Sequence, residues 1–274
     1  MVKPGSQIGK QCNIILGPVR PDSPYAPAIG GLSLGMSQWE SPGERPWRLR
    51  VPDWHAWRME TRFVPDHLAL SVVAGSRAYG LETEDSDVDR RGVFVAPTPL
   101  FWRLAKPPTH VEGPLPEQFS WEVERFCGLA LEANPTVLEC LWSPIVEHAA
   151  PAGEDLLAIR RAFLSRRAHQ TFTGYTDAQF RRLDPGRPKW KQAMHMIRLL
   201  LSGLHLVRHG EPLVRMDDHR DRLLAVRRGE ISWSEVQRWR AELTACFDGT
   251  SALPAQPDRQ RVEDYLATVR KAAL

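Results

Sequence analysis

The pattern of apolar and polar positions divides the chain into a strand-rich part followed by a helix-rich part. The apolar run 68–74 is short and rich in valine and leucine, which is typical of a buried strand. Residues 93–95 predict a second strand, and residues 117–122 predict a third strand of the same small mixed sheet. A glycine and a serine, Gly75 and Ser76, close the first run, so we expect a tight turn and a short helix there.

Helical spacing dominates the rest of the chain. Asn134 and Pro135 predict the end of one helix and the capped start of the next. The longest stripe of apolar positions runs over 189–209 and is closed by Gly210. A capping box, Ser232 with Glu235, predicts a helix to about residue 246, and the last helix covers 258–274. The fold class is therefore α+β, with an α/β core over 53–122 and a helical domain over 123–274.

The first 52 residues are rich in proline and glycine and show no periodicity. We interpret them as a flexible extension or as the result of a start codon assigned too far upstream. A short helix is expected over 54–62, where it would pack against the first strand.

Composition narrows the class of protein further. The chain is 42% hydrophobic and 25% charged, as in ordinary globular proteins. No apolar run approaches the roughly 18 residues of a membrane span, and no signal peptide precedes the core, so we expect a cytoplasmic protein without a membrane partner. The four cysteines lack zinc-ligand or paired spacing, which favours reduced thiols.

Charge is concentrated in one segment although the net charge is only +3. Residues 160–191 contain nine basic and two acidic side chains and are net +7. Such a segment attracts polyphosphate or nucleic acid, but a solvated, arginine-rich helix face has the same composition.

The chemistry-bearing pattern is the stretch GSRAYGLETEDSDVDRRGVFV, residues 75–95. Glycine lets a ligand approach the backbone, and the N–H groups of the turn and of the new helix attract phosphate, with the Ser76 hydroxyl as a further donor. Ten residues later stand Asp87 and Asp89. Two aspartates at i and i+2 on a strand face the same side, so both can bind one Mg²⁺ or Mn²⁺ or a pair of these ions.

Gly-Ser, ten residues and Asp-x-Asp resemble the signature of the DNA polymerase beta-like nucleotidyltransferase superfamily. The fuller stretch resembles the nucleotidyltransferases of its RNA-repair-pathway branch. The resemblance continues in LALEANPTVLECLWSP (129–144) after Phe126, and in KQAMHMIRLL (191–200), and spans roughly 65–230. It implies a small mixed-sheet nucleotidyltransferase head followed by a helical bundle, with a nucleoside triphosphate as substrate.

The superfamily places a third carboxylate on the third strand. Alignment on Phe126 puts Glu117 at the position of that carboxylate, and Glu122 is the competing candidate on the opposite strand face. Both differ from the aspartate of the pattern. We expect Asp87, Asp89 and Glu117 to be the catalytic and metal-binding set.

Several further residues are candidates for contact with the nucleotide. Gly75, Ser76 and Arg77 would bind phosphates, Arg77 through its bidentate guanidinium. Arg91 is either a second clamp or part of a structural ion pair. Lys191, His195 and Arg198 share a helix face and could close over the triphosphate, whereas Tyr79 is expected to pack the turn.

These expectations define the function hypotheses. The first is a metal-dependent enzyme that moves a nucleoside monophosphate from a nucleoside triphosphate to a hydroxyl, most simply at an RNA end. The second is an enzyme that modifies a protein, as in antitoxin-like adenylylation, or a small molecule. The third is a catalytically silent module that binds nucleotide or RNA.

Overall fold

The computed structural model describes residues 64–247, 249 and 251–274. Five strands form one mixed sheet in the order β3-β4-β2-β1-β5. Only the β2–β4 pair is parallel among the described strand pairs. The strands are β1 (Leu68–Val73), β2 (Arg90–Phe94), β3 (His110–Glu112), β4 (Gln118–Glu122) and β5 (Val146–Ala149).

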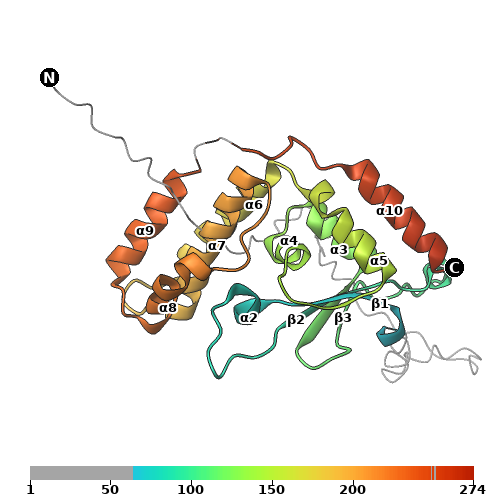
Figure 1. The fold of residues 1–274 in the computed structure, drawn as a ribbon, viewed down its shortest axis with the longest axis horizontal. Coiled ribbons are helices and arrows are strands. Elements are labelled where there is room, and N and C mark those ends of the chain that lie inside the picture. Colours follow the sequence, from blue (N-terminus) through green and yellow to red (C-terminus); the bar gives the residue numbers. More distant parts are fainter. Residues whose placement is uncertain (1–63, 248, 250) are drawn as a thin grey trace, which may run out of the picture.

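Helices cover the sheet on one side and extend beyond it, as Figure 1 shows. The α-helices are α2 (Gly75–Tyr79), α3 (Val123–Leu131), α4 (Pro135–Leu141), α5 (Pro151–Ala158), α6 (Arg167–Phe180), α7 (Trp190–His209), α8 (Arg220–Arg228), α9 (Trp233–Ala245) and α10 (Arg259–Ala272). Short 3-10 helices are η1 (Pro65–His67), η2 (Thr98–Trp102), η3 (Arg160–Phe163) and η4 (Asp217–His219). A mixed sheet followed by helices confirms the α+β class.

The strands differ from expectation in three places. Asp87 and Asp89 precede β2, which begins at Arg90, so their assignment to a strand is wrong. The edge strands β3 and β5 were missed because they are short and mostly exposed, and therefore show no apolar alternation. As a result, the sheet includes β5, which lies within the stretch 123–274 that was expected to be helical.

The helix boundaries follow the local signals. The Asn134 side chain accepts a hydrogen bond from the Val137 amide at 3.3 Å and caps α4, with Pro135 at its first position. Ser232 and Glu235 form the expected capping box of α9. Gly210 takes the left-handed conformation that ends α7.

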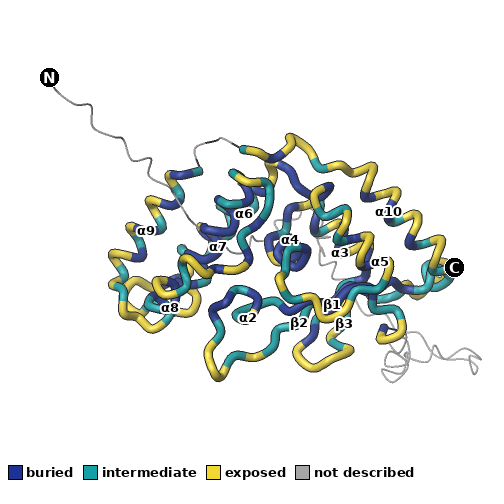
Figure 2. Tube along the Cα trace, viewed as in Figure 1, coloured by how far each residue is buried: buried dark blue, intermediate teal, exposed yellow. Residues whose placement is uncertain are grey.

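The core lies between the sheet and the helices, and Figure 2 shows the buried positions concentrated there. Its largest fully buried side chains include Phe126, Phe163 and Phe172, whereas Phe94 is buried in a separate small cluster with Val64 and Ala96. Helix α7 is buried along most of its length, since α6, α8 and α9 pack around it. This helix is therefore the centre of the helical part of the chain.

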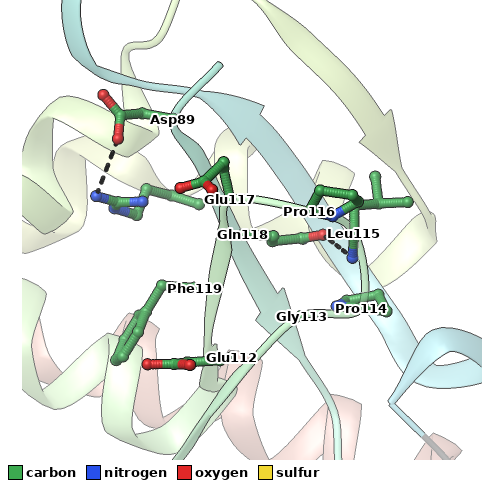
Figure 3. A pocket seen from close by; sticks show the side chains of 10 residues that line it. Asp89, Glu112, Gly113, Pro114, Leu115, Pro116, Glu117, Gln118 and Phe119 are labelled. Carbon is green, nitrogen blue, oxygen red and sulfur yellow. Dashed lines mark hydrogen bonds and ion pairs between the residues drawn. The ribbon is translucent and has the colours of Figure 1, made fainter. Parts of the chain in front are cut away.

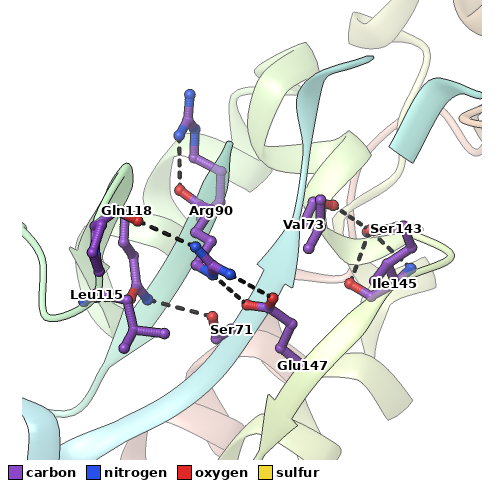
Figure 4. Close-up of polar contacts among 10 residues, drawn as sticks. Ser71, Val73, Arg90, Leu115, Gln118, Ser143, Ile145 and Glu147 are labelled. Carbon is purple, nitrogen blue, oxygen red and sulfur yellow. Dashed lines mark hydrogen bonds and ion pairs between the residues drawn. The ribbon is translucent and has the colours of Figure 1, made fainter. Parts of the chain in front are cut away.

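Polar contacts join the strands that carry the candidate site (Figure 4). On one face, Arg90 pairs with Glu147 at 2.8 Å, which joins β2 to β5. A Cβ at Gly92 would lie 2.3 Å from the Ser120 hydroxyl and 2.6 Å from the Gln118 amide nitrogen, so a larger residue on β2 would displace these side chains. Strand packing therefore favours the glycine of the sequence motif.

Two cysteines, Cys127 and Cys140, are free and buried as expected. Cys246 is disulfide-bonded, so the expectation of reduced thiols is wrong for this residue, because spacing along the chain does not reveal which thiols meet in space.

The expected extension 1–52 and helix 54–62 lie outside the described residues. Within the described part of the chain, no helix is both long enough and apolar enough to cross a membrane.

Candidate active site

The Gly-Ser turn and the second aspartate are in direct contact. Gly75 opens α2 with φ at +64°, a left-handed conformation that favours glycine. A Cβ at Gly75 would lie 2.0 Å from Oδ2 of Asp89. Glycine is required here both by the backbone conformation and by the carboxylate packed against it. The two halves of the sequence motif therefore meet in space.

The loop between these two halves is braced from both sides. From the head, Arg77 donates a hydrogen bond to the Ser86 carbonyl at 3.0 Å. From the helical part, Arg227 donates to the Leu81 carbonyl at 3.1 Å and Arg220 to the Gly80 carbonyl at 2.8 Å. These contacts fix the path of the loop and hence the position of the aspartates.

A cavity of about 110 Å³ lies between the turn, the aspartates and α7; we call it the turn cavity. Its lining brings together most of the site residues expected from the sequence. Arg77 does not contribute to it. The lining residues are Gly75, Ser76, Asp85, Ser86, Asp87, Asp89, Lys191, Met194, His195 and Arg227.

Arg227 is the basic lining residue that sequence reasoning missed, and Asp85, Ser86 and Met194 also line the cavity without having been expected there. Arg227 lies on α8, well beyond the recognised motifs, and only the packing of α8 against α7 brings it to the cavity. No local sequence signal distinguishes it from the neighbouring arginines of the same helix.

His195 is uncharged at neutral pH. Burial is the main cause that lowers the pKa of its imidazole, and the nearby positive charges of Arg198, Lys191 and Arg227 lower it further, to about 3. A neutral imidazole can donate a hydrogen bond to a phosphate oxygen or accept one, but it adds no charge to the cavity.

A larger cavity of about 600 Å³ lies on the other side of Asp89; we call it the outer cavity (Figure 3). Arg91 and Asp89 both line this cavity, and the Arg91 guanidinium lies 3.9 Å from the Asp89 carboxylate. Of the two roles expected for Arg91, this contact agrees with the ion pair. Glu117 also lines it, from a left-handed backbone conformation with φ at +55°. Phe119 contributes a ring that stacks on His110 at 5.2 Å between centroids. Asp89 lines both cavities and Asp87 only the turn cavity.

Glu122, the alternative third carboxylate, is engaged elsewhere. It is 4% exposed and accepts bonds from both terminal nitrogens of Arg270, at 2.8 and 2.9 Å. It also accepts from the Glu124 amide at 2.8 Å, which caps α3. Its role is to fasten α10 and α3 to the sheet.

Arg198 was a candidate to close over the triphosphate, but it does not line the turn cavity. It is 3% exposed and donates to both oxygens of Glu139, at 2.7 and 3.1 Å. Its guanidinium lies 3.6 Å from the centroid of the Tyr79 ring, and the Tyr79 hydroxyl donates to Glu139 at 2.8 Å. This buried cluster, Tyr79–Glu139–Arg198, joins α2, α4 and α7. Tyr79 packs the turn, as predicted.

The carboxylates offer hard oxygen donors of the kind that Mg²⁺ and Mn²⁺ prefer. Among the described residues, however, no three His, Cys, Asp or Glu side chains converge as a group able to hold a metal ion. Asp89 is the carboxylate that could link Asp87 on one side with Glu117 on the other, because it lines both cavities.

Comparison with known proteins decides the family. The pattern of the RNA repair pathway DNA polymerase beta family matches residues 59–268. The chain belongs to this family. Its members are DNA polymerase beta-like, a class that implies nucleotidyl transfer and typically uses divalent metals.

One curated protein is also similar to part of the chain. The chain is 30% identical over 97 residues to the uncharacterized protein YcgL of Bacillus subtilis (strain 168). The match covers 34% of this chain and 37% of YcgL, so it spans only part of either protein. No solved structure significantly matches the chain.

Proposed function

We propose that this protein is a metal-dependent nucleotidyltransferase that moves a nucleoside monophosphate from a nucleoside triphosphate to a hydroxyl at an RNA end. The turn cavity carries the proposal. In this cavity the Gly-Ser turn and the two aspartates meet two basic side chains, Lys191 of α7 and Arg227 of α8. The chain belongs to a family of the DNA polymerase beta class.

The phosphates would lie in the turn cavity. Ser76 and the backbone at Gly75 would donate hydrogen bonds to them, and Lys191 and Arg227 would offset their charge. His195, being neutral, would orient a phosphate oxygen by a hydrogen bond. Arg77 would act through the loop that it braces, because its guanidinium bonds Ser86.

Asp87, Asp89 and Glu117 would hold Mg²⁺ or Mn²⁺. Such an ion, when bound, neutralises the triphosphate and lowers the pKa of the attacking hydroxyl. In the transfer, the acceptor oxygen forms a bond to the α-phosphorus, and the bond to the bridging oxygen breaks so that pyrophosphate leaves. Glu117, on the acceptor side of Asp89, would take the proton of the hydroxyl.

The outer cavity would receive the acceptor. It adjoins the turn cavity at Asp89 and has an aromatic wall at Phe119, on which a nucleobase can stack. These features favour a nucleoside end over a protein side chain. The alternatives are transfer to a protein or a small molecule, and a silent nucleotide- or RNA-binding module.

The test is incubation of purified protein with each α-labelled nucleoside triphosphate, Mg²⁺ or Mn²⁺, and total cellular RNA. The Asp87→Asn/Asp89→Asn variant is run in parallel, with Asp66→Asn/Glu84→Gln as a control of equal charge change at exposed positions. Label in RNA with the wild type and the control, but not with the site variant, supports the proposal.

Other outcomes contradict it. Label on protein or on a small molecule identifies a different acceptor. Nucleotide binding by a folded protein without transfer of label to RNA, protein or small molecules indicates the silent module.

A further inference from the structure

A third cavity, far from the aspartates, has the chemistry of an anion site. It has a volume of about 350 Å³ and lies where the end of α3, the start of α6 and the segment before α10 meet. Its lining includes Arg166, Arg167 and Arg259 together with Glu132. We call it the arginine cavity.

The arginines are arranged so that positive charge remains available. Arg167 pairs with Glu132. Arg166 uses its Nε to reach the Leu253 carbonyl at 3.4 Å, which leaves its terminal nitrogens for other partners. The Arg259 side chain has no partner among the described residues, and it is exposed. Three guanidinium groups against one carboxylate give the cavity a surplus of positive charge.

The start of α6 adds to this charge. The helix has 14 residues and begins at Arg167 without a side-chain cap. The Ala168 and His169 amides already bond the Ser165 and Arg166 carbonyls, at 3.0 and 3.1 Å, so it is the helix dipole that favours an anion at this end. By itself a helix terminus does not define a site.

Ser165 provides the independent observation. It lines the arginine cavity, is 1% exposed, and its hydroxyl has no hydrogen-bond partner among the described residues. A buried hydroxyl without a partner is unfavourable, because it has lost its hydrogen bonds to water. A phosphate oxygen in the cavity would accept its hydrogen bond, and guanidinium groups bind phosphate oxygens in the same way.

The arginine cavity is separate from the turn cavity. The Ala252 amide bonds the Val207 carbonyl in the last turns of α7, and the Arg166 amide bonds the Pro254 carbonyl next to it. Lys191 and His195 lie in the first turns of the same helix. At 1.5 Å per residue, roughly 24 Å of helix separates Lys191 from Val207.

We propose that the arginine cavity is a second phosphate-binding site. A phosphate of an RNA backbone and a free phosphate or nucleotide share the chemistry that this cavity recognises. The site also accounts for Arg166 and Arg167 of the basic segment 160–191. Other residues of that segment have structural partners, such as Arg161, which pairs with Glu211 at 2.9 Å.

Binding measurements without turnover test this site independently of any transfer activity. The probes are a fluorescein-labelled single-stranded RNA of mixed sequence, followed by anisotropy, and inorganic phosphate and ATP as competitors. The variants are Ser165→Ala and Arg166→Gln/Arg259→Gln. Arg182→Gln/Arg187→Gln is the matched control, because it removes the same charge from exposed positions of the same segment.

We expect the double cavity variant to bind RNA about tenfold more weakly, with a salt slope reduced by about two, and the control to lose less than about twofold. Ser165→Ala should weaken binding about two- to fivefold without loss of thermal stability, because its hydroxyl has no partner to lose within the described protein. If inorganic phosphate binding falls in these variants while RNA binding does not, the ligand is a free phosphate.

Equal losses in the cavity variant and the control would overturn the proposal, since charge alone would then explain them. Unchanged binding of RNA, phosphate and ATP in folded cavity variants would overturn it as well.

Discussion

Neighbouring turns on one face of α7 use their basic residues differently. Lys191 and His195, in the first turns of α7, line the turn cavity, whereas Arg198, one turn further on, is enclosed between Tyr79 and Glu139. The first pair is exposed or partly buried, and Arg198 is 3% exposed. Residues of a single motif therefore divide into a group that faces ligand and a group that holds α2 in place.

This difference indicates that the Tyr79–Glu139–Arg198 cluster supports the turn cavity. Helix α2 begins at Gly75 and ends at Tyr79, so the Tyr79–Glu139–Arg198 cluster fixes the helix whose first residue contacts Asp89. The positions of the phosphate turn and of α7 are thereby linked through the core. Changes in the cluster should alter stability, and changes in the cavity should alter transfer.

The largest effect is expected from breaking the buried pair. Arg198→Met leaves the Glu139 carboxylate buried without its cation, and such a loss costs about 3–5 kcal/mol of unfolding free energy. Urea unfolding measures it. The paired replacement Arg198→Met/Glu139→Leu removes both charges and should restore most of that stability. A rise in the KM for nucleotide at unchanged stability would contradict the structural role and return Arg198 to the cavity group.

The largest loss of transfer activity is expected at Asp89, the aspartate that lines both cavities. Its effect on the unfolding free energy should be smaller than that of Arg198. Asp89→Asn keeps the shape and removes the charge, so transfer of label should fall at least about 100-fold. Unfolding free energy should stay within about 0.5 kcal/mol, because the ion pair of Asp89 with Arg91 is long and partly exposed. Transfer at the wild-type rate would show that Asp89 does not act in the reaction.

How far the sequence predicts this arrangement follows from the same residues. The Gly-Ser turn and the aspartates lie within one short segment, so their spacing predicts that they meet. Helical spacing predicts that Lys191, His195 and Arg198 lie on one face of a helix. It does not reveal that α2 and α4 cover this face at Arg198. Arg227 and Glu139 join these groups only through packing between distant helices. The edge strands β3 and β5 lack a buried face to produce a pattern.

The contact between the turn and Asp89 can be tested by adding one methyl group. Gly75→Ala strains the backbone at φ +64° and places Cβ on the Asp89 carboxylate. We expect a loss of about 1–2 kcal/mol in unfolding free energy and a loss of transfer activity, because the carboxylate must move. Gly210→Ala is the matched control. It has φ at +75°, but its nearest heavy atom is 3.8 Å away.

The control should therefore lose stability by a similar strain and keep its transfer activity. If both variants transfer label equally well, the packing of Gly75 on Asp89 has no role in positioning the carboxylate.

The smallest effect is the pH dependence of His195. Its folded pKa, about 3, lies below the unfolded value near 6.5, so the unfolded chain binds the proton more readily. Well above pH 6.5 His195 is neutral in both states and does not change the unfolding free energy. As the pH falls from 6.5 towards 3, the unfolded chain takes up a proton that the folded chain does not, so the unfolding free energy decreases. At pH 5.5 the loss is about 1.4 kcal/mol relative to pH 7.5. Urea unfolding of the metal-free protein at both pH values measures it.

The variant His195→Gln should show a drop smaller by that amount, because glutamine cannot be protonated in this range. An equal drop in both proteins would mean that the His195 ring takes up its proton in the folded state, with the cations around it too far away or too well solvated to oppose the charge.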